Sequence, residues 1–218
     1  MGCSTSNLTN LKMFISLPEK LVMEKEQYLS KLSSYQKLSV GFKAYLNYSI
    51  CQTDFSRMEK ISFNSIELGR FCYLAKGFGR IFIYDTENEK EITIMLFQSQ
   101  DILPDLKSIS KYLQGQLFIQ FSENTTLLSI PIKHSDNMHK LFRESATLCA
   151  EINAEILTKI INILTGLKIQ NAEQRLNKLL EFFPTVFSQT AVKDVASYLG
   201  IHSSTLSAMR NGNKKHAR

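Results

Sequence analysis

The sequence predicts an α+β fold in which an N-terminal antiparallel β sandwich or barrel is followed by a long helix and a C-terminal helix-turn-helix domain. Three observations lead to this prediction: strand-like runs from about Phe42 to Ile132, a helical stripe of apolar residues after them, and a tight two-helix motif beyond residue 190. Hydrophobic residues make up 44% of the 218 residues and charged residues 21%, which is typical of a globular protein and not of a disordered chain.

The first expected element is a helix over residues 19–39 that begins just after Pro18, with an irregular start over residues 1–11. Apolar residues recur at helical spacing between lysines and glutamates, and they are Leu21, Tyr28, Leu32 and Tyr35. This spacing places them on one face of the helix.

Between about Phe42 and Ile132, short runs rich in Phe, Tyr, Ile and Thr alternate with turn residues. Arg80–Tyr84 and Glu91–Phe97 are the clearest pair, because a polar loop joins two strand-like runs as in a β-hairpin. Several such runs at intervals of roughly 8–12 residues predict the antiparallel sandwich or barrel.

A helical period replaces the strand pattern between His139 and about Gln170, where no proline occurs and only Gly166 interrupts. The apolar residues form one stripe, and they are Cys149, Ile152, Ile156, Ile160, Ile163 and Leu167. We therefore predict a helix of about 30 residues, roughly 45 Å long. A small barrel cannot cover such a helix, so we predict that the stripe pairs with the same helix of a second copy. The alternative is a core helix packed along its own barrel.

The segment from Val192 to Asn211 has the residue pattern of a helix-turn-helix. Two helices that cross closely need a small residue where they touch, which Ala196 supplies, and the turn needs a residue that tolerates positive φ, which Gly200 supplies. Apolar residues on both helices form a small predicted core of Val195, Leu199, Ile201, Leu206 and Met209. The run His202–Ser204 offers hydroxyl caps for the second helix.

Positive charge is concentrated at the C-terminal end. The formal net charge is +6, and residues 168–218 hold eight Lys or Arg against three Asp or Glu, whereas residues 1–167 hold 18 against 17. A basic module on a nearly neutral body is typical of nucleic-acid binding, and the alternative is a solvated tail. Together with the helix-turn-helix, this distribution predicts double-stranded DNA as a partner; the alternative is a motif that serves protein contacts only.

Enzyme motifs are absent from the sequence, which has no GxSxG, no P-loop and no HExxH, so we predict no enzymatic activity. The four cysteines are scattered without a CxxC pair, which predicts neither a metal site nor a disulfide framework and suits the reducing cytoplasm. No apolar run reaches the ~18–20 residues of a membrane-spanning helix, so we expect no membrane association.

Two C-terminal segments, Ala172–Pro184 and Val192–Ile201, together with Thr205-Leu206-Ser207, resemble the DNA-binding half of the CRP/FNR family of bacterial transcription regulators. The likeness is strongest to the short-tailed branch that is common in Bacteroidetes. The runs Ala75–Arg80 and Glu89–Thr93 resemble hairpins of that family's sensor domain.

The resemblance implies a jelly-roll sensor barrel of the cyclic-nucleotide-binding type with its N-terminal helix over residues 1–137, a dimerisation helix over residues 138–170 and a helix-turn-helix DNA-binding domain over residues 171–218. It also implies a homodimer that places its two second helices in successive major grooves. RNA polymerase is a further implied partner.

By position, the resemblance implies a DNA-contacting set on the C-terminal helices. The set comprises Ser203, Ser204, Thr205, Ser207 and Ala208 on the second helix, mostly at base edges, and Thr190, Lys193, Arg210, Lys214 and Lys215 at phosphates. Relatives that read guanine carry Arg or Glu on this helix, whereas hydroxyls bond several bases, so we expect weak base discrimination. The alternative is an interaction protein that kept the fold but lost specific DNA reading.

Cyclic-nucleotide binders of this family hold the phosphate with Gly-Glu and with Arg-Ser or Arg-Thr, where this sequence has Pro104-Asp105 and Gln116-Leu117. Asp105 can still hold a ribose hydroxyl, but Gln116 cannot neutralise a phosphate and Pro104 has no N–H to donate. We therefore expect a degenerate sensor with no cyclic nucleotide and no cofactor, with Asp105 and Gln116 as the residual effector-binding candidates. The alternative is a regulator that senses a different small ligand.

Overall fold

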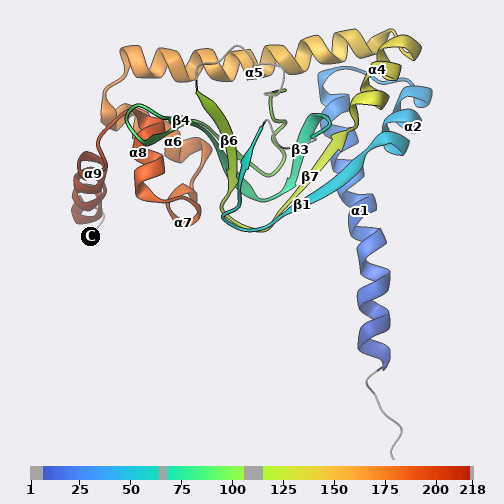
Figure 1. Ribbon diagram of the computed structural model, residues 1–218, viewed down its shortest axis with the longest axis horizontal. Coiled ribbons are helices and arrows are strands. Elements are labelled where there is room, and N and C mark those ends of the chain that lie inside the picture. Colours follow the sequence, from blue (N-terminus) through green and yellow to red (C-terminus); the bar gives the residue numbers. More distant parts are fainter. Residues whose placement is uncertain (1–6, 64–67, 106–114, 217–218) are drawn as a thin grey trace, which may run out of the picture.

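A computed structural model describes residues 7–63, 68–105 and 115–216, with side chains over residues 19–63, 68–105 and 115–211 (Figure 1). The N-terminal helices are α1 (Asn7–Tyr35) and α2 (Val40–Ser49). The strands are β1 (Cys51–Phe55), β2 (Lys60–Ser62), β3 (Arg70–Lys76), β4 (Phe78–Asp85), β5 (Lys90–Gln98), β6 (Gln116–Phe121) and β7 (Thr125–Ile130). The C-terminal helices are α4 (Ile132–Leu141), α5 (Glu144–Ile169), α6 (Ala172–Phe182), α7 (Val186–Gln189), α8 (Val192–Leu199) and α9 (Ser203–His216). No helix among these described residues combines the length and the apolar character that crossing a bilayer requires.

The strands form two antiparallel sheets, with strand orders β1-β7-β3 and β2-β6-β4-β5. Side chains from both sheets meet between them, and Leu74, Ile81, Ile119 and Leu127 are fully buried there. β4 and β5 form the predicted hairpin, in which Ile83 lies opposite Ile92. The predicted α+β architecture, with a jelly-roll-like β domain, a long helix and C-terminal helices, is therefore confirmed.

Helices cover the outer face of the β1-β7-β3 sheet. Tyr28 of α1 stacks on Tyr73 of β3 with ring centroids 4.9 Å apart, and Leu148 and Ile152 of α5 are buried in the same cluster. α5 runs along one side of the molecule, from the N-terminal helices at one end to the C-terminal helices at the other (Figure 1). This helix therefore connects the two ends structurally.

The N-terminal helices differ from the prediction in two ways. α1 begins at Asn7 and continues through Pro18, because a proline removes one backbone donor without always ending a helix. The start of the predicted strand region forms helix α2 instead, where Ser39 Oγ accepts a hydrogen bond from the N–H of Phe42 at 3.2 Å and caps the first turn. Phe42 and Leu46 lie one turn apart and are both buried, a helical period that the strand interpretation missed.

The long helix predicted from His139 to Gln170 is two helices. α4 ends at Leu141 and α5 begins at Glu144, with an extended backbone at Phe142. The break lets the Phe142 ring stack on Phe42, with centroids 4.8 Å apart. Packing against α2 therefore interrupts a segment whose local sequence favours one continuous helix. The predicted domain boundary at residues 137/138 lies inside α4, while that at 170/171 coincides with Asn171, the N-cap of α6.

The apolar stripe proposed for dimerisation faces the protein's own body. Ile152 is buried in the core, and Cys149 and Ile156 pack against the same cluster. Ile160 and Ile163 are half-buried, and Leu167 is the exposed member of the stripe. The structure therefore favours the alternative of a core helix for this stripe, because a β domain and C-terminal helices together cover more of α5 than a barrel alone.

Glu155 of α5 ties this helix to α1. One carboxylate oxygen lies 3.1 Å from Lys31 Nζ on α1, and the other lies 2.9 Å from Lys159 Nζ, one turn along α5. Burial opposes ionisation of Glu155, but hydrogen bonds from Lys159, Tyr35 and Lys31 outweigh it and lower its pKa to about 2. A carboxyl with a lowered folded-state pKa stabilises the protein above its ordinary pKa, and this stabilisation is lost as the pH falls towards 2.

We therefore expect Glu155→Gln to lower the free energy of unfolding by about 1 kcal/mol at pH 7, since the group is partly solvated and its charge partly screened. At pH 2, close to the pKa of Glu155 in the folded protein, most of this stabilisation is lost, so the difference should become small. Urea unfolding of both proteins at the two pH values measures this. An equal loss at both would show that Glu155 acts through packing instead of charge.

Candidate nucleic-acid interface

α8 and α9 form the helix-turn-helix that the sequence predicts. Gly200 ends α8 with a φ of +64°, in the left-handed region that glycine adopts at little cost. The N–H of Gly200 donates to the carbonyl of Ser197 at 3.1 Å, and the N–H of Ile201 donates to the carbonyl of Ala196 at 3.0 Å. These bonds close α8 with a tight turn and direct the chain into α9.

An apolar core holds the two helices together. The core is the predicted one: Val195, Ala196, Leu199 and Leu206 are buried, with Ile201 and Met209 packed against them. At the start of α9, His202 Nδ1 accepts a hydrogen bond from the N–H of Ser204 at 3.4 Å. A ring nitrogen therefore takes the place that the sequence analysis gave to a hydroxyl cap.

The face of α9 opposite this core carries small side chains. All five positions of α9 that were predicted to contact DNA near its start are exposed, namely Ser203, Ser204, Thr205, Ser207 and Ala208. Ser207 Oγ donates to the carbonyl of Ser203 at 2.9 Å, so its proton is engaged inside the helix and its oxygen is presented as an acceptor. From Ser203 to the end of the chain the sequence contains no carboxylate that would repel DNA.

The predicted phosphate-contacting residues lie in different surroundings. Lys193 is exposed in the first turn of α8, where the helix dipole also favours an anion. Thr190 follows α7, and its Oγ1 is buried without a hydrogen-bond partner among the described residues. The Arg210 guanidinium lies over the Phe187 ring of α7, 4.0 Å from its centroid, and thereby links α9 to α7. The side chains of Lys214 and Lys215 lie outside the described set.

A buried ion pair joins the headpiece, defined as α6 to α9, to the β domain. Asp194 of α8 is 7% exposed, and its Oδ1 lies 3.0 Å from Nη1 of Arg80 on β4, which is 4% exposed. Arg80 also donates to Gln120 Oε1 at 3.0 Å, to Thr93 Oγ1 at 3.1 Å and to Glu91. Burial raises the pKa of Asp194, and the positive charge of Arg80 opposes that shift.

The same interface contains a backbone contact and an aromatic contact. The β4–β5 register shifts beside Thr93, and the N–H of Thr93 donates to Ser197 Oγ of α8 at 2.9 Å. Phe78 of β4 lies edge-on to Phe183 after α6, with ring centroids 5.7 Å apart. The sequence analysis missed this interface because residues so distant along the chain leave no local pattern. α9 itself lies at the outer edge of the molecule (Figure 1).

The candidate effector residues have separate partners. Asp105 Oδ2 lies 3.8 Å from Nε of Arg70, at the start of β3. Gln116 begins β6 opposite Tyr84 of β4. Both side chains are exposed. Among the described residues, no group of three or more His, Cys, Asp or Glu residues could hold a metal ion.

Neither family models nor curated proteins match this sequence. Solved structures do resemble it. A protein from Eubacterium rectale assigned to the crp/fnr family of transcriptional regulators aligns with a TM-score of 0.61 and 17% identity, over 82% of this chain and 85% of that chain. The fold is that of the CRP/FNR transcription regulators.

Two further structures agree with this CRP/FNR fold. FixK2 from Bradyrhizobium japonicum aligns with a TM-score of 0.58 and 13% identity, over 77% of this chain and 86% of that one. A double mutant of CooA from Carboxydothermus hydrogenoformans aligns with a TM-score of 0.56 and 18% identity, over 86% of this chain and 84% of that one. At these identities the likeness establishes the fold, which places a helix-turn-helix after a jelly-roll-like domain.

Proposed function

We propose that this protein is a homodimeric DNA-binding transcription regulator that inserts α9 of each copy into successive major grooves. The observation that carries the proposal is the exposed, carboxylate-free face of α9, which the headpiece core leaves open at Ser204, Thr205 and Ala208. A helix about 10–12 Å in diameter matches a major groove about 12 Å wide. We propose RNA polymerase as a further partner.

Short hydroxyl side chains suit loose reading of bases. A serine hydroxyl both donates and accepts, so Ser203 and Ser204 can bond more than one base, whereas a bidentate Arg selects guanine. Lys193, at the start of α8, supplies a positive charge for a phosphate, together with Lys214 and Lys215. We infer that much of the affinity comes from phosphates and depends on salt.

The dimer interface that we propose is the outward stripe of α5. Leu157, Ile161 and Leu164 are 57%, 51% and 55% exposed, and their steps of four and three residues are those of a coiled-coil seam. Ala150 and Ala154 extend this outward stripe with small exposed side chains. A contiguous apolar stripe on a helix is typical of a protein contact, unlike single exposed apolar residues.

A control step is proposed at the junction of α5 and α6. Gln170 is extended between the two helices, and Asn171 caps α6 in a reciprocal pair of hydrogen bonds with Gln174. Rotation about this junction changes the spacing of two headpieces relative to DNA half-sites about one turn apart. Gln116 carries no positive charge, so we infer that the effector of this step is not a cyclic nucleotide.

A second candidate is an interaction protein that kept the fold without specific DNA reading. The observation in its favour is Ser207, whose proton is bound to the backbone of α9 and is not offered to a base. If this second candidate is correct, the protein either binds all DNA duplexes with the same weak affinity or binds no DNA.

We expect the purified protein to enrich two-fold-symmetric sites from fragmented genomic DNA of its source. Ala208→Glu should reduce affinity for a selected site at least roughly tenfold, because it places a carboxylate against the phosphate-lined groove. Lys193→Ala should weaken binding to all sequences alike and lower the salt slope by about one per headpiece. Fluorescence anisotropy at several salt concentrations measures both effects.

Lys140→Ala is the matched control for Lys193→Ala, because Lys140 is exposed on α4, away from α9 and from the outward stripe of α5. It should change neither affinity nor salt slope. Enrichment of no site, with equal affinity for every duplex, would favour the interaction protein. Unchanged binding by Ala208→Glu would remove α9 as the reading helix.

A further inference from the structure

A pocket of about 320 Å³ lies where the β domain, α5 and the headpiece meet. Phe97 and Leu103 contribute from the β domain, Ile163 and Leu167 from α5, and Leu179 from the headpiece. Its walls are therefore mainly apolar. Its volume falls in the lower part of the range of roughly 300–1,000 Å³ that is typical of small-ligand pockets.

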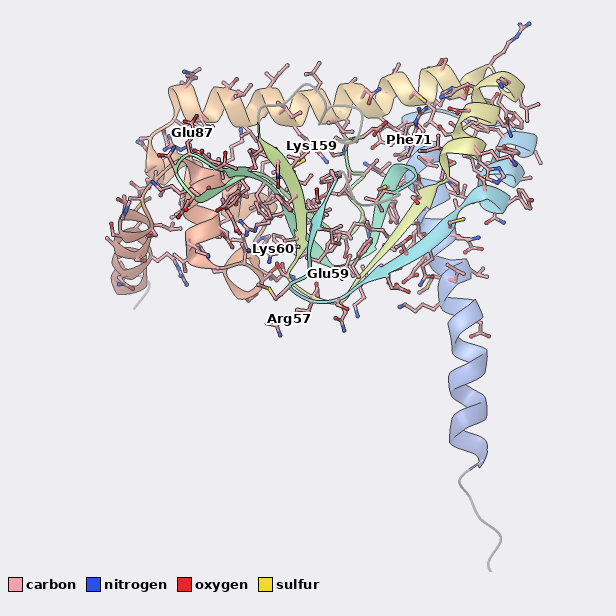
Figure 2. All side chains as sticks on the ribbon, viewed as in Figure 1. Arg57, Glu59, Lys60, Phe71, Glu87 and Lys159 are labelled. Atoms are coloured by element: carbon pink, nitrogen blue, oxygen red, sulfur yellow. The ribbon has the colours of Figure 1, made fainter. Side chains whose placement is uncertain are left out.

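Basic side chains also line this pocket, from α5 and from α6. Lys159 points from α5 towards the β domain (Figure 2), where its Nζ lies 3.0 Å from Asp101 Oδ1, and it also pairs with Glu155. The charge of Lys159 is therefore compensated. Arg175 and Lys178 of α6 are not compensated, since no carboxylate of the described chain lies within ion-pair distance of either.

Arg175 is already held in position for a ligand. Its Nε donates to the carbonyl of Leu199 at 2.9 Å, and its Nη1 donates to the carbonyl of Gln170. These bonds fix the guanidinium plane, and its Nη2 has no partner among the described residues. A fixed guanidinium with a neighbouring ammonium is an arrangement that recognises a carboxylate.

We propose that the pocket binds a small amphipathic monocarboxylate, with its apolar body between β5 and α5 and its carboxylate on Arg175 and Lys178. A neutral apolar ligand would leave the two cations unpaired. A strongly polar anion such as a nucleotide would lose hydration against the apolar walls without compensating hydrogen bonds. The apolar walls and the two cations therefore both favour an amphipathic monocarboxylate.

The place of the pocket gives the ligand a route to the headpiece, an extension that rests on the proposed function. Arg175 bridges Gln170, the residue that follows α5, and Leu199, the last residue of α8. A carboxylate on Arg175 adds a contact across this junction and favours the headpiece position seen here. The outward stripe of Leu157, Ile161 and Leu164 lies on the opposite side of α5, so a second copy does not compete with the ligand.

Decanoate is the probe for this proposal, with decanol and decylamine as matched ligands that keep the apolar body and change the charge. We expect isothermal titration of the full-length protein to give saturable binding of one decanoate per chain. Decanol and decylamine should bind at least roughly tenfold more weakly. No decanoate binding, or equal binding of decanol, would overturn the proposal.

Two variants locate the binding. Lys178→Gln removes one cation from a half-buried position on α6 and should weaken decanoate binding severalfold without changing decanol binding. Ile163→Trp fills the apolar part and should abolish binding of both, with circular dichroism confirming that the variant is folded. Lys168→Gln, the control on α5 outside the pocket, should bind decanoate normally. Unchanged binding in both pocket variants would place the ligand elsewhere and overturn the proposal.

The DNA measurement is separate from the binding measurement, so the two proposals fail independently. Decanoate binding without DNA binding would leave the carboxylate pocket standing and remove the regulator function. DNA binding without decanoate binding would leave the regulator function standing and remove the carboxylate pocket. When both are observed, decanoate should shift DNA affinity in the unaltered protein and not in Ile163→Trp.

Discussion

Replacing Arg80 by alanine is expected to lower the free energy of unfolding by about 3–5 kcal/mol. Arg80 is buried, and it neutralises Glu91 of β5 and Asp194 of α8 together. Its removal leaves the buried Asp194 carboxylate without an ion-pair partner among the described residues, beside the half-buried Glu91, which keeps only Lys60. Because Asp194 belongs to α8, the same change should release the headpiece from the β domain.

Chemical unfolding measures the loss of stability, and hydrogen exchange at Thr93 measures the release. The Thr93 N–H is bound to Ser197 Oγ across the interface, so its exchange should accelerate under native conditions. Lys60→Ala is the control, since Lys60 pairs with Glu91 from the exposed side and its loss should cost at most about 1 kcal/mol. In Figure 2, Lys60 lies in the β domain, well apart from α9.

The Asp194→Asn variant distinguishes the cost of burying an uncompensated charge from the contribution of the Arg80–Asp194 ion pair itself. Burial already raises the pKa of Asp194, so the ionised carboxylate is costly there, and an amide of the same shape should be tolerated far better than Arg80→Ala. An Asp194→Asn variant as unstable as Arg80→Ala would mean that the pair itself, and not the burial of uncompensated charge, holds the interface.

The helix-turn-helix was predictable because its constraints are local. Gly200 at the turn, Ala196 at the crossing and the apolar positions around them lie within twenty residues, so each appears in the sequence as a spacing. The β4–β5 hairpin was predictable for the same reason, since a polar loop directly joins its two strands. Local rules therefore suffice wherever the contacting residues are neighbours in the chain.

The remaining features depend on contacts between distant residues. Val40–Ser49 is helical because Phe42 and Leu46 pack against α1 and α5, although aromatic residues also suit strands. Arg80 and Asp194 are unremarkable in sequence until the fold brings them together. On α5, two apolar stripes share one helical period, so the sequence could not show which of them the β domain covers.

Because of this ambiguity, substitutions on α5 are needed to test which stripe forms the dimer interface. Ile161→Glu should convert a dimer into a monomer, since it places a carboxylate of each copy in the centre of the apolar seam. Ile161 is half-exposed in the isolated chain, so the monomer should remain folded. Loss of pairing should reduce affinity for a two-fold-symmetric site by roughly 100-fold or more, because the two headpieces no longer bind together.

Leu167→Glu is the matched comparison, because Leu167 belongs to the stripe that faces the protein's own body. Light scattering coupled to size exclusion should show a monomer for Ile161→Glu and a dimer for Leu167→Glu, with circular dichroism checking that both are folded. The reverse result would mean that α5 turns its inward stripe outward when two copies meet. That rotation would remove Leu167 from the wall of the carboxylate pocket and so disrupt the pocket. Dimerisation and ligand binding would then exclude each other. The two variants therefore show which stripe of α5 forms the dimer interface and whether the dimer can bind a ligand in the pocket.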